Sequence, residues 1–113
     1  MRKAIIFGAG GHARVIASML SNKVSDILFV DQQARGTDVL EEAQILRDID
    51  QYRNCDFYIG LGSNKLRSNI FGVLLDLEIY PSNCIADNAF VARDAELGQG
   101  VVICPGGVVG SRA

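Results

Sequence analysis

Residues 85–113 read IADNAF, VARDAE, LGQGVV, ICPGGV and VGSRA when they are divided into groups of six. The first position of each group is aliphatic, the second is Ala, Gly or Cys, and the fifth is Ala, Gly or Val. A large aliphatic residue at every sixth position, followed by small residues at fixed offsets, predicts short strands stacked in a triangular parallel β-helix. The aliphatic side chains would point inward, and the small residues would occupy the corners between its walls.

An ordinary strand-and-turn region with alternating Val and Gly is the alternative interpretation. Five consecutive groups that agree at three positions favour the repeat. The pattern resembles that of the hexapeptide-repeat acyltransferases, whose left-handed β-helix takes three groups of six to a coil. On that pattern the tail makes only about one and a half coils, whereas at least three repeating units are normally needed for stability. We therefore expect residues 83–113 to be the start of a left-handed β-helix, and the chain to be the front part of a longer protein.

The composition predicts a globular chain with one modest domain ahead of this tail. Of its 113 residues, 49% are hydrophobic and 21% are charged. A net charge of −2 without a basic run gives no reason to expect binding to nucleic acid or to a membrane surface, and no apolar segment approaches the length of a membrane span. Cys55, Cys84 and Cys104 form neither a zinc pattern nor a disulfide framework, so we expect reduced thiols in a cytoplasmic protein.

A short aliphatic strand and a glycine motif begin the chain. Residues 3–7 (KAIIF) are typical of a buried parallel strand, and residues 8–13 (GAGGHA) match G-x-G-x-x-A ahead of apolar residues at helical spacing. Strand, glycine turn and helix are the context in which this motif binds phosphate. Gly8 would allow the tight turn, Gly10 would allow close backbone approach, and the helix N-terminus would offer free N–H groups.

Asp31 follows a second predicted strand, residues 27–30, and lies 21 positions after Gly10. An acidic residue near this distance often binds a ribose hydroxyl, although Asp31 would also serve as a simple cap at the strand end. A complete dinucleotide fold needs more than the ~85 residues that precede the repeat. A mononucleotide or a nucleotide sugar is therefore an alternative ligand to NAD.

The remaining elements are clearest near the middle of the chain. Residues 55–61 predict a third strand, Ser63 a helix N-cap, residues 64–77 a helix, and residues 77–80 a last short strand. Between the second and third strands the pattern is weak, with a turn at residues 36–38, a short strand or helix start at residues 43–46, and a helical turn at residues 48–53. Alternating elements with short links predict a small Rossmann-like α/β domain of residues 1–82 with an open parallel sheet.

Two groups of residues are candidates for ligand contact. His12 is the only histidine, and although lone histidines are more often structural, its place at the glycine loop favours contact with a diphosphate. A second group follows the third strand, at the sheet edge where ligands bind in open α/β folds: Gly62, Ser63, Asn64 and Lys65. A solvated helix face is the alternative for Lys65. The sequence shows no Ser-His-Asp set, carboxylate pair or metal-ligand cluster, so we expect no metal.

A glycine loop followed by a hexapeptide repeat is a specific order of elements. It resembles the bacterial sugar O-acyltransferases of the sialic acid O-acetyltransferase family, which also includes the UDP-4-amino-sugar N-acetyltransferases. The likeness lies in residues 5–13 (IIFGAGGHA), 29–31 (FVD) and 58–67 (YIGLGSNKLR), together with the groups of six from residue 85.

The resemblance implies a substrate site in this chain and a donor site largely outside it. In that family the small domain binds the nucleotide sugar, and the β-helix builds the acetyl-CoA site between neighbours of a homotrimer. By resemblance, Gly10, Gly11 and His12 would contact the nucleotide sugar, Asp31 would contact its nucleoside, and Gly62 would line the same cleft. The neighbouring candidates complete the expected substrate-binding set: Gly8, Ser63, Asn64 and Lys65. The general-base histidine belongs to a later coil, so we expect no catalytic residue here and no acetyl transfer by this chain alone.

The implied reaction is acetyl transfer from acetyl-CoA to a UDP- or CMP-linked amino sugar or a sialic acid, in surface polysaccharide biosynthesis. A base histidine would take the proton of the attacking amine or hydroxyl, and backbone N–H groups would stabilise the oxyanion. The alternatives are a non-catalytic nucleotide-binding module, either NAD-type or regulatory, and a trimerisation element.

Overall fold

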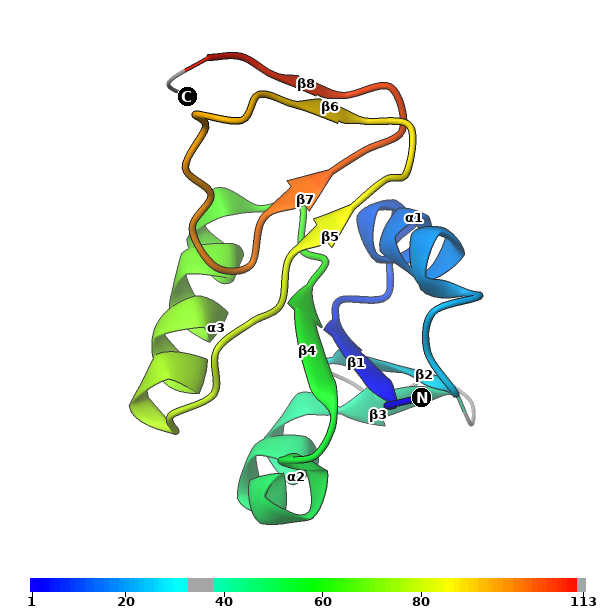
Figure 1. Ribbon diagram of the computed structural model, residues 1–113. Helices are drawn as coiled ribbons and strands as arrows, with labels where there is room; N and C mark the ends of the chain where they lie inside the picture. The colour runs from blue at the N-terminus through cyan, green and yellow to red at the C-terminus, as the bar shows by residue number, and fades with distance from the viewer. Residues whose placement is uncertain (33–37, 112–113) are drawn as a thin grey trace.

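The computed structural model describes residues 1–32 and 38–111. Its larger part is a parallel sheet of four strands in the order β3-β2-β1-β4, with helices on both faces (Figure 1). The strands are β1 (Ala4–Phe7), β2 (Ile27–Asp31), β3 (Val39–Glu41) and β4 (Asp56–Ile59). The helices are α1 (Gly11–Leu20), α2 (Glu42–Arg47), α3 (Asn64–Asp76) and the short 3-10 helix η1 (Ile49–Tyr52). Helix α1 follows β1 and helix α3 follows β4, so both helices begin at the same edge of the parallel sheet.

The central strand β1 is buried on both faces. Ile5 and Phe7 belong to the hydrophobic core beneath α2 and α3, where Leu74 is completely buried. Ala4 and Ile6 face the other way and pack in a second core with residues of α1. Because both faces are covered by helices, the strand reads as a continuous apolar run instead of an alternating one.

The structure confirms three of the predicted strands, as β1, β2 and β4, and it confirms the predicted helix after Ser63. The Ser63 hydroxyl caps α3 by accepting the N–H of Leu66 at 3.3 Å. In the weak middle region, residues 43–46 form part of helix α2, residues 49–52 form the predicted helical turn, and strand β3 was not predicted. Of the predicted turn, Gly36 and Thr37 lie outside the described residues.

The predicted strand at residues 77–80 is wrong, because the end of α3 turns back on itself. Glu78 adopts a left-handed backbone with φ of 60°, and its N–H donates to the Leu75 carbonyl at 2.9 Å. The Ile79 N–H donates to the Leu74 carbonyl at 2.8 Å, which completes a Schellman motif. Ile79 is apolar because it returns to the core beside Leu74, not because it continues a strand.

Glu78→Gly is expected to stabilise the chain by ~1 kcal/mol, because glycine adopts the left-handed conformation without the strain of a Cβ. The free energy of unfolding in urea measures the effect. Asp76→Gly, two positions earlier in the regular helix, is the matched control and should lower stability. A Glu78→Gly variant no more stable than the parent would contradict this interpretation of the helix end.

The tail forms two pairs of short parallel strands. They are β5 (Cys84–Ile85) with β7 (Val102–Ile103), and β6 (Phe90–Val91) with β8 (Val108–Val109). In both pairs the partners are 18 positions apart, and two asparagine side chains repeat this offset by accepting N–H groups: Asn83 from Val101 and Asn88 from Gly106. Eighteen residues equal three groups of six, the length predicted for one coil. The left-handed β-helix itself, and the division of the chain at residue 82, stay predictions.

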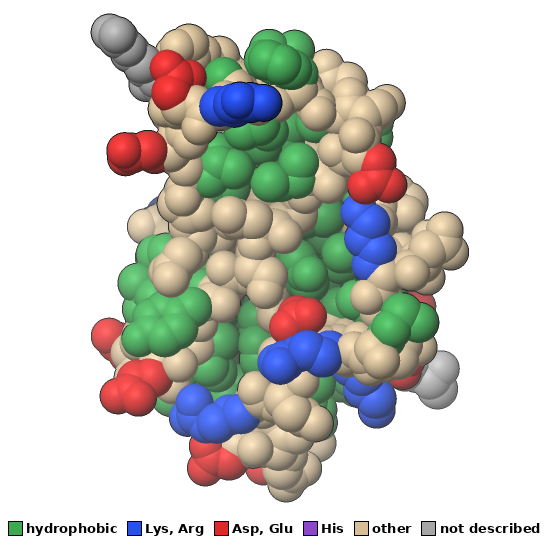
Figure 2. All heavy atoms as spheres, in the orientation of Figure 1, with side chains coloured by type: hydrophobic (Ala, Val, Ile, Leu, Met, Phe, Trp, Pro, Cys, Tyr) green, Lys and Arg blue, Asp and Glu red, His purple; other side chains and the backbone are tan. Residues whose placement is uncertain are grey.

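The tail lies at one end of the molecule, beside α1 and the start of α3 (Figure 1). Cys84 is buried in the core on the α1 side of the sheet, and Lys23, three residues after α1, forms an ion pair with Asp87 at 2.9 Å. Figure 2 shows hydrophobic side chains gathered over the tail on the face that it presents. Phe90 and Val108, which pair across β6 and β8, are 60% and 73% exposed.

Candidate functional site

Gly8 lies where the chain leaves β1, and only glycine fits there. Its φ is +121°, and a Cβ at this position would lie 2.4 Å from the Gly60 carbonyl oxygen. The Gly8 N–H donates to the Val30 carbonyl at 2.6 Å, and the Gly60 N–H donates to the Phe7 carbonyl at 2.8 Å. The glycine therefore lets the carboxyl ends of β1, β2 and β4 close against one another.

Gly10 and Gly11 are not required by packing as Gly8 is, because a Cβ on either would meet nothing within 4 Å. Gly10 is the N-cap of α1 with an ordinary φ of −88° and no side-chain cap, and its carbonyl accepts the N–H of Arg14 at 3.1 Å. The N–H groups of the first turn have no partner within the helix, and the positive end of the helix dipole lies there. Exposed backbone at such a position is suited to binding an anionic group. His12, which is half-buried, belongs to the same turn.

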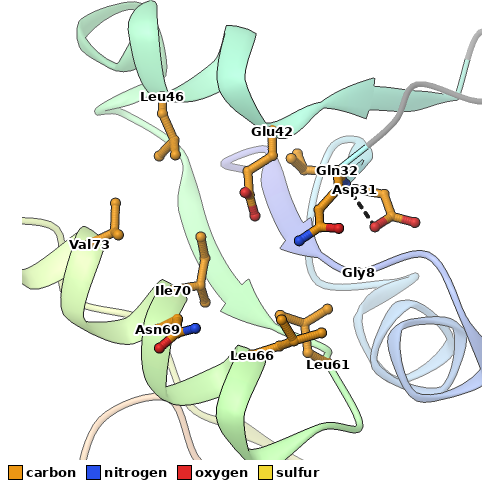
Figure 3. Close-up of a pocket in the computed structure, with 11 residues that line it drawn as sticks. Gly8, Asp31, Gln32, Glu42, Leu46, Leu61, Leu66, Asn69, Ile70 and Val73 are labelled. Atoms are coloured by element: carbon orange, nitrogen blue, oxygen red, sulfur yellow. Dashed lines mark hydrogen bonds between the residues drawn. The ribbon is translucent and has the colours of Figure 1, made fainter.

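A cavity of about 240 Å³ opens beside this loop (Figure 3). One wall is apolar and is made by Leu46, Leu61, Leu66, Ile70 and Val73. The polar side chains come from β2 and the segment after it, from α2, and from α3: Asp31, Gln32, Glu42 and Asn69. Gly8 belongs to both the glycine loop and the cavity wall, so the two features are continuous.

The cavity lies at the carboxyl edge of the sheet. The chain runs from β1 to its neighbour β2 on one side, and β4 later adds on the other side of β1. In open α/β sheets, ligands bind at the carboxyl edge near such a switch in strand order. Two helices of ten and thirteen residues, α1 and α3, also begin at this edge.

Two carboxylates share the polar side of the cavity. Asp31 pairs in register with Glu41 across β2 and β3, so Glu42 is the next residue beyond the pair. Burial raises the pKa of the Glu42 carboxyl, and the negative charge of Asp31 raises it further. Asp31 accepts the Gln32 N–H at 2.8 Å, while the Glu42 carboxylate points into the cavity (Figure 3).

The residues predicted to contact a ligand occupy three places along this edge. Gly8 and Asp31 line the cavity, and Gly10, Gly11 and His12 lie at the start of α1. The third place is the start of α3, where the predicted residues do not line this cavity: Gly62, Ser63, Asn64 and Lys65. Ser63 caps the helix, and Lys65 is exposed. Asn64 accepts a hydrogen bond from Arg67, and both line a second cavity of about 300 Å³.

Glu42, Gln32 and Asn69 were not predicted from the sequence. Glu42 falls in the region where the sequence pattern was weakest, and its proximity to Asp31 depends on the pairing of β2 with β3. One feature of the sequence could have indicated a cavity beside α3: the apolar stripe of this helix is wider than packing against the core requires. Leu66 and Val73 remain 41% and 39% exposed because they line the cavity.

Other kinds of site find no support in the part of the chain that the structure describes. Within residues 1–32 and 38–111, no three His, Cys, Asp or Glu side chains are grouped so as to hold a metal ion. None of the helices there has the length and apolar character needed to cross a bilayer. Acidic and basic side chains are mixed over the face shown in Figure 2. All three cysteines are free.

Comparison with known proteins gives a consistent result. The PglD N-terminal domain family matches residues 3–74, whereas a search of curated proteins found no match. Among solved structures, the acetyltransferase domain of PglB from Neisseria gonorrhoeae, in complex with acetyl coenzyme A, is 26% identical with a TM-score of 0.84. The alignment covers 95% of this chain and 55% of that one.

A point mutant of perosamine N-acetyltransferase from Caulobacter crescentus, in complex with CoA and GDP-perosamine, is 24% identical with a TM-score of 0.84. The alignment covers 98% of this chain and 55% of that one. At this identity the likeness supports the fold alone. The chain thus spans about half the length of the solved proteins that it matches. The resemblance noted in the sequence is confirmed. Because the matched residues 3–74 are well over half of the chain, this chain belongs to the PglD N-terminal domain family.

Proposed function

We propose that this chain is the acceptor-binding part of an acetyl-CoA-dependent acetyltransferase that acts on a nucleotide-linked amino sugar. The observation that carries the proposal is the open backbone of Gly10 and Gly11 at the start of α1, continuous through Gly8 with a cavity that contains Asp31. A phosphate-binding position and a partly apolar cavity side by side match the two halves of a nucleotide.

Each part of the ligand has a place in this arrangement. The diphosphate would bind the N–H groups of the first turn of α1, with His12 beside it. The nucleoside would enter the cavity, where Asp31 would accept ribose hydroxyls and the apolar wall would pack against the base. The sugar would extend past Gly62 and the start of α3 toward the tail. These positions hold and orient the acceptor, a contribution that accelerates transfer without direct chemistry.

The comparisons support acetyl-CoA as the donor, because the PglB domain is in complex with acetyl coenzyme A. We propose an amino group as acceptor: its nitrogen would attack the thioester carbonyl carbon, its proton would pass to a base, and the CoA thiolate would leave. The donor site would lie mainly outside these 113 residues, on a β-helix that residues 83–113 begin. We also propose a cytoplasmic homotrimer, supported by the free cysteines and by the exposed apolar pair Phe90 and Val108.

Isothermal titration calorimetry of the 113-residue chain with UDP-, CMP- and GDP-linked sugars and with NAD tests the proposal. We expect one of the nucleotide sugars to bind at least about tenfold more tightly than NAD, because the described sheet has four strands and offers no second mononucleotide half for the dinucleotide. Micromolar NAD binding without binding of any nucleotide sugar would contradict the proposal and favour a dinucleotide-binding module.

A further inference from the structure

We propose that Glu42 reads the base of the bound nucleotide and selects guanine. This inference rests on the proposed function, because it takes the cavity to be the nucleoside site. It also departs from the UDP- or CMP-linked substrate expected from the sequence, which came from resemblance and not from the residues of the cavity.

The geometry places Glu42 across the cavity from an apolar wall. Glu42 begins α2, and its carboxylate points inward, while Leu66 and Ile70 approach from α3 (Figure 3). No described residue forms a hydrogen bond or an ion pair with this carboxylate. A base that enters the cavity with one edge turned toward Glu42 would therefore meet a carboxylate with free acceptor capacity, while Leu66 and Ile70 supply apolar contact.

The chemistry of an ionised carboxylate favours guanine over the other bases. A carboxylate has acceptors only, and it can accept two parallel hydrogen bonds. Guanine offers two adjacent donors on one edge, N1–H and the N2 amino group. Uracil offers one N–H between two carbonyl oxygens, so the second carboxylate oxygen would face a like partial charge. Cytosine and adenine each present a donor beside a lone-pair nitrogen. The amide groups of Gln32 and Asn69 are available to donate to the guanine carbonyl.

Glu42 is held where its charge is unfavourable in the free protein. Among the described residues that line the cavity, Asp31 and Glu42 are the titratable ones, and burial together with the Asp31 charge raises the Glu42 pKa. A carboxyl with a raised folded-state pKa stabilises the fold below its unfolded pKa, and this contribution is lost as pH rises through the folded pKa. At neutral pH the ionised Glu42 therefore lowers stability, a pattern common at functional sites.

The test compares Glu42→Gln with the control Glu41→Gln by titration with GDP, UDP, CDP and ADP at pH 7.5. Glu41 is the exposed neighbour at the N-cap position of α2, where its side chain makes no capping hydrogen bond, so its replacement removes the same charge outside the cavity. We expect the parent to bind GDP at least about tenfold more tightly than the other three nucleotides. Glu42→Gln should weaken GDP binding by about tenfold to a hundredfold and leave UDP binding within about threefold. It should also raise the melting temperature, which separates lost recognition from misfolding. Glu41→Gln should retain the parent's preference.

The outcomes distinguish this inference from the proposed function. A preference for UDP, or a GDP-to-UDP ratio unchanged by Glu42→Gln, would overturn the role of Glu42 while leaving nucleotide binding intact. If none of the four nucleotides nor any nucleotide sugar bound to the parent, the proposed function itself would be wrong.

Discussion

Gly8→Ala is expected to lower the free energy of unfolding by at least ~3 kcal/mol, a large share of the ~5–15 kcal/mol typical of a small domain. The φ of +121° is strained for any residue with a Cβ, and strain of this kind costs ~1–3 kcal/mol. The added methyl would also lie 2.4 Å from the carbonyl oxygen of Gly60 and 2.9 Å from its carbonyl carbon. Both are backbone atoms within the sheet edge, so the strands themselves would have to move. Circular dichroism during urea unfolding measures the loss.

Gly62→Ala is the matched control for this effect. Gly62 follows β4 at the same edge of the sheet, but its φ lies outside the left-handed region, and a Cβ there meets nothing within 4 Å. Its stability should stay within ~1 kcal/mol of the parent. If Gly8→Ala unfolded at the same urea concentration as Gly62→Ala, the close approach of Gly8 to Gly60 would not be a requirement of the fold.

Gly10→Val is expected to weaken nucleotide-sugar binding by about a hundredfold or more, while the fold survives. Gly10 has an ordinary φ, and the space around its missing Cβ is empty, so a valine there causes no clash in the free protein. Its loss of stability should not exceed the ~1 kcal/mol associated with a poor N-cap residue. The branched side chain would, however, occupy the space through which a phosphate must approach the N–H groups of α1.

Calorimetry with the best-binding nucleotide sugar, together with a thermal melt, tests this expectation. Gly98→Val is a suitable control, because Gly98 also has empty space around its missing Cβ but lies in the tail and lines neither the glycine loop nor the cavity. It should bind as the parent does. Parent-like binding by Gly10→Val would show that the glycine loop is not the phosphate site.

The two glycines show how far a motif can be interpreted without a structure. The sequence identifies Gly8 and Gly10 as members of one phosphate-binding pattern. In the structure Gly8 is required by the packing of three strand ends, whereas Gly10 leaves space that the free protein does not use. A motif names the residues, but the packing around each one separates a structural requirement from a candidate ligand contact.

Local interactions made much of the fold predictable from the sequence alone. The apolar run of β1, the cap at Ser63 and the period of six in the tail depend on residues that are close in the chain or repeat at a fixed interval. The 18-residue offset of the tail strands follows from that period. The place of the glycine loop between a strand and a helix follows from the local order of β1, the glycine motif and α1.

Only the tertiary structure decided the remainder, because it depends on contacts between distant segments. Strand β3 is three residues long and forms by pairing with β2, and this pairing brings Glu42 beside Asp31. The alternation of apolar and polar residues at positions 77–80 suggested a strand, but the left-handed turn at Glu78 returns Ile79 to the core instead. Leu66 and Val73 likewise looked like core positions until their partial exposure showed that they line a cavity. Side-chain type and spacing indicate that a residue packs against another part of the protein. The long-range pairing of strands determines which part that is.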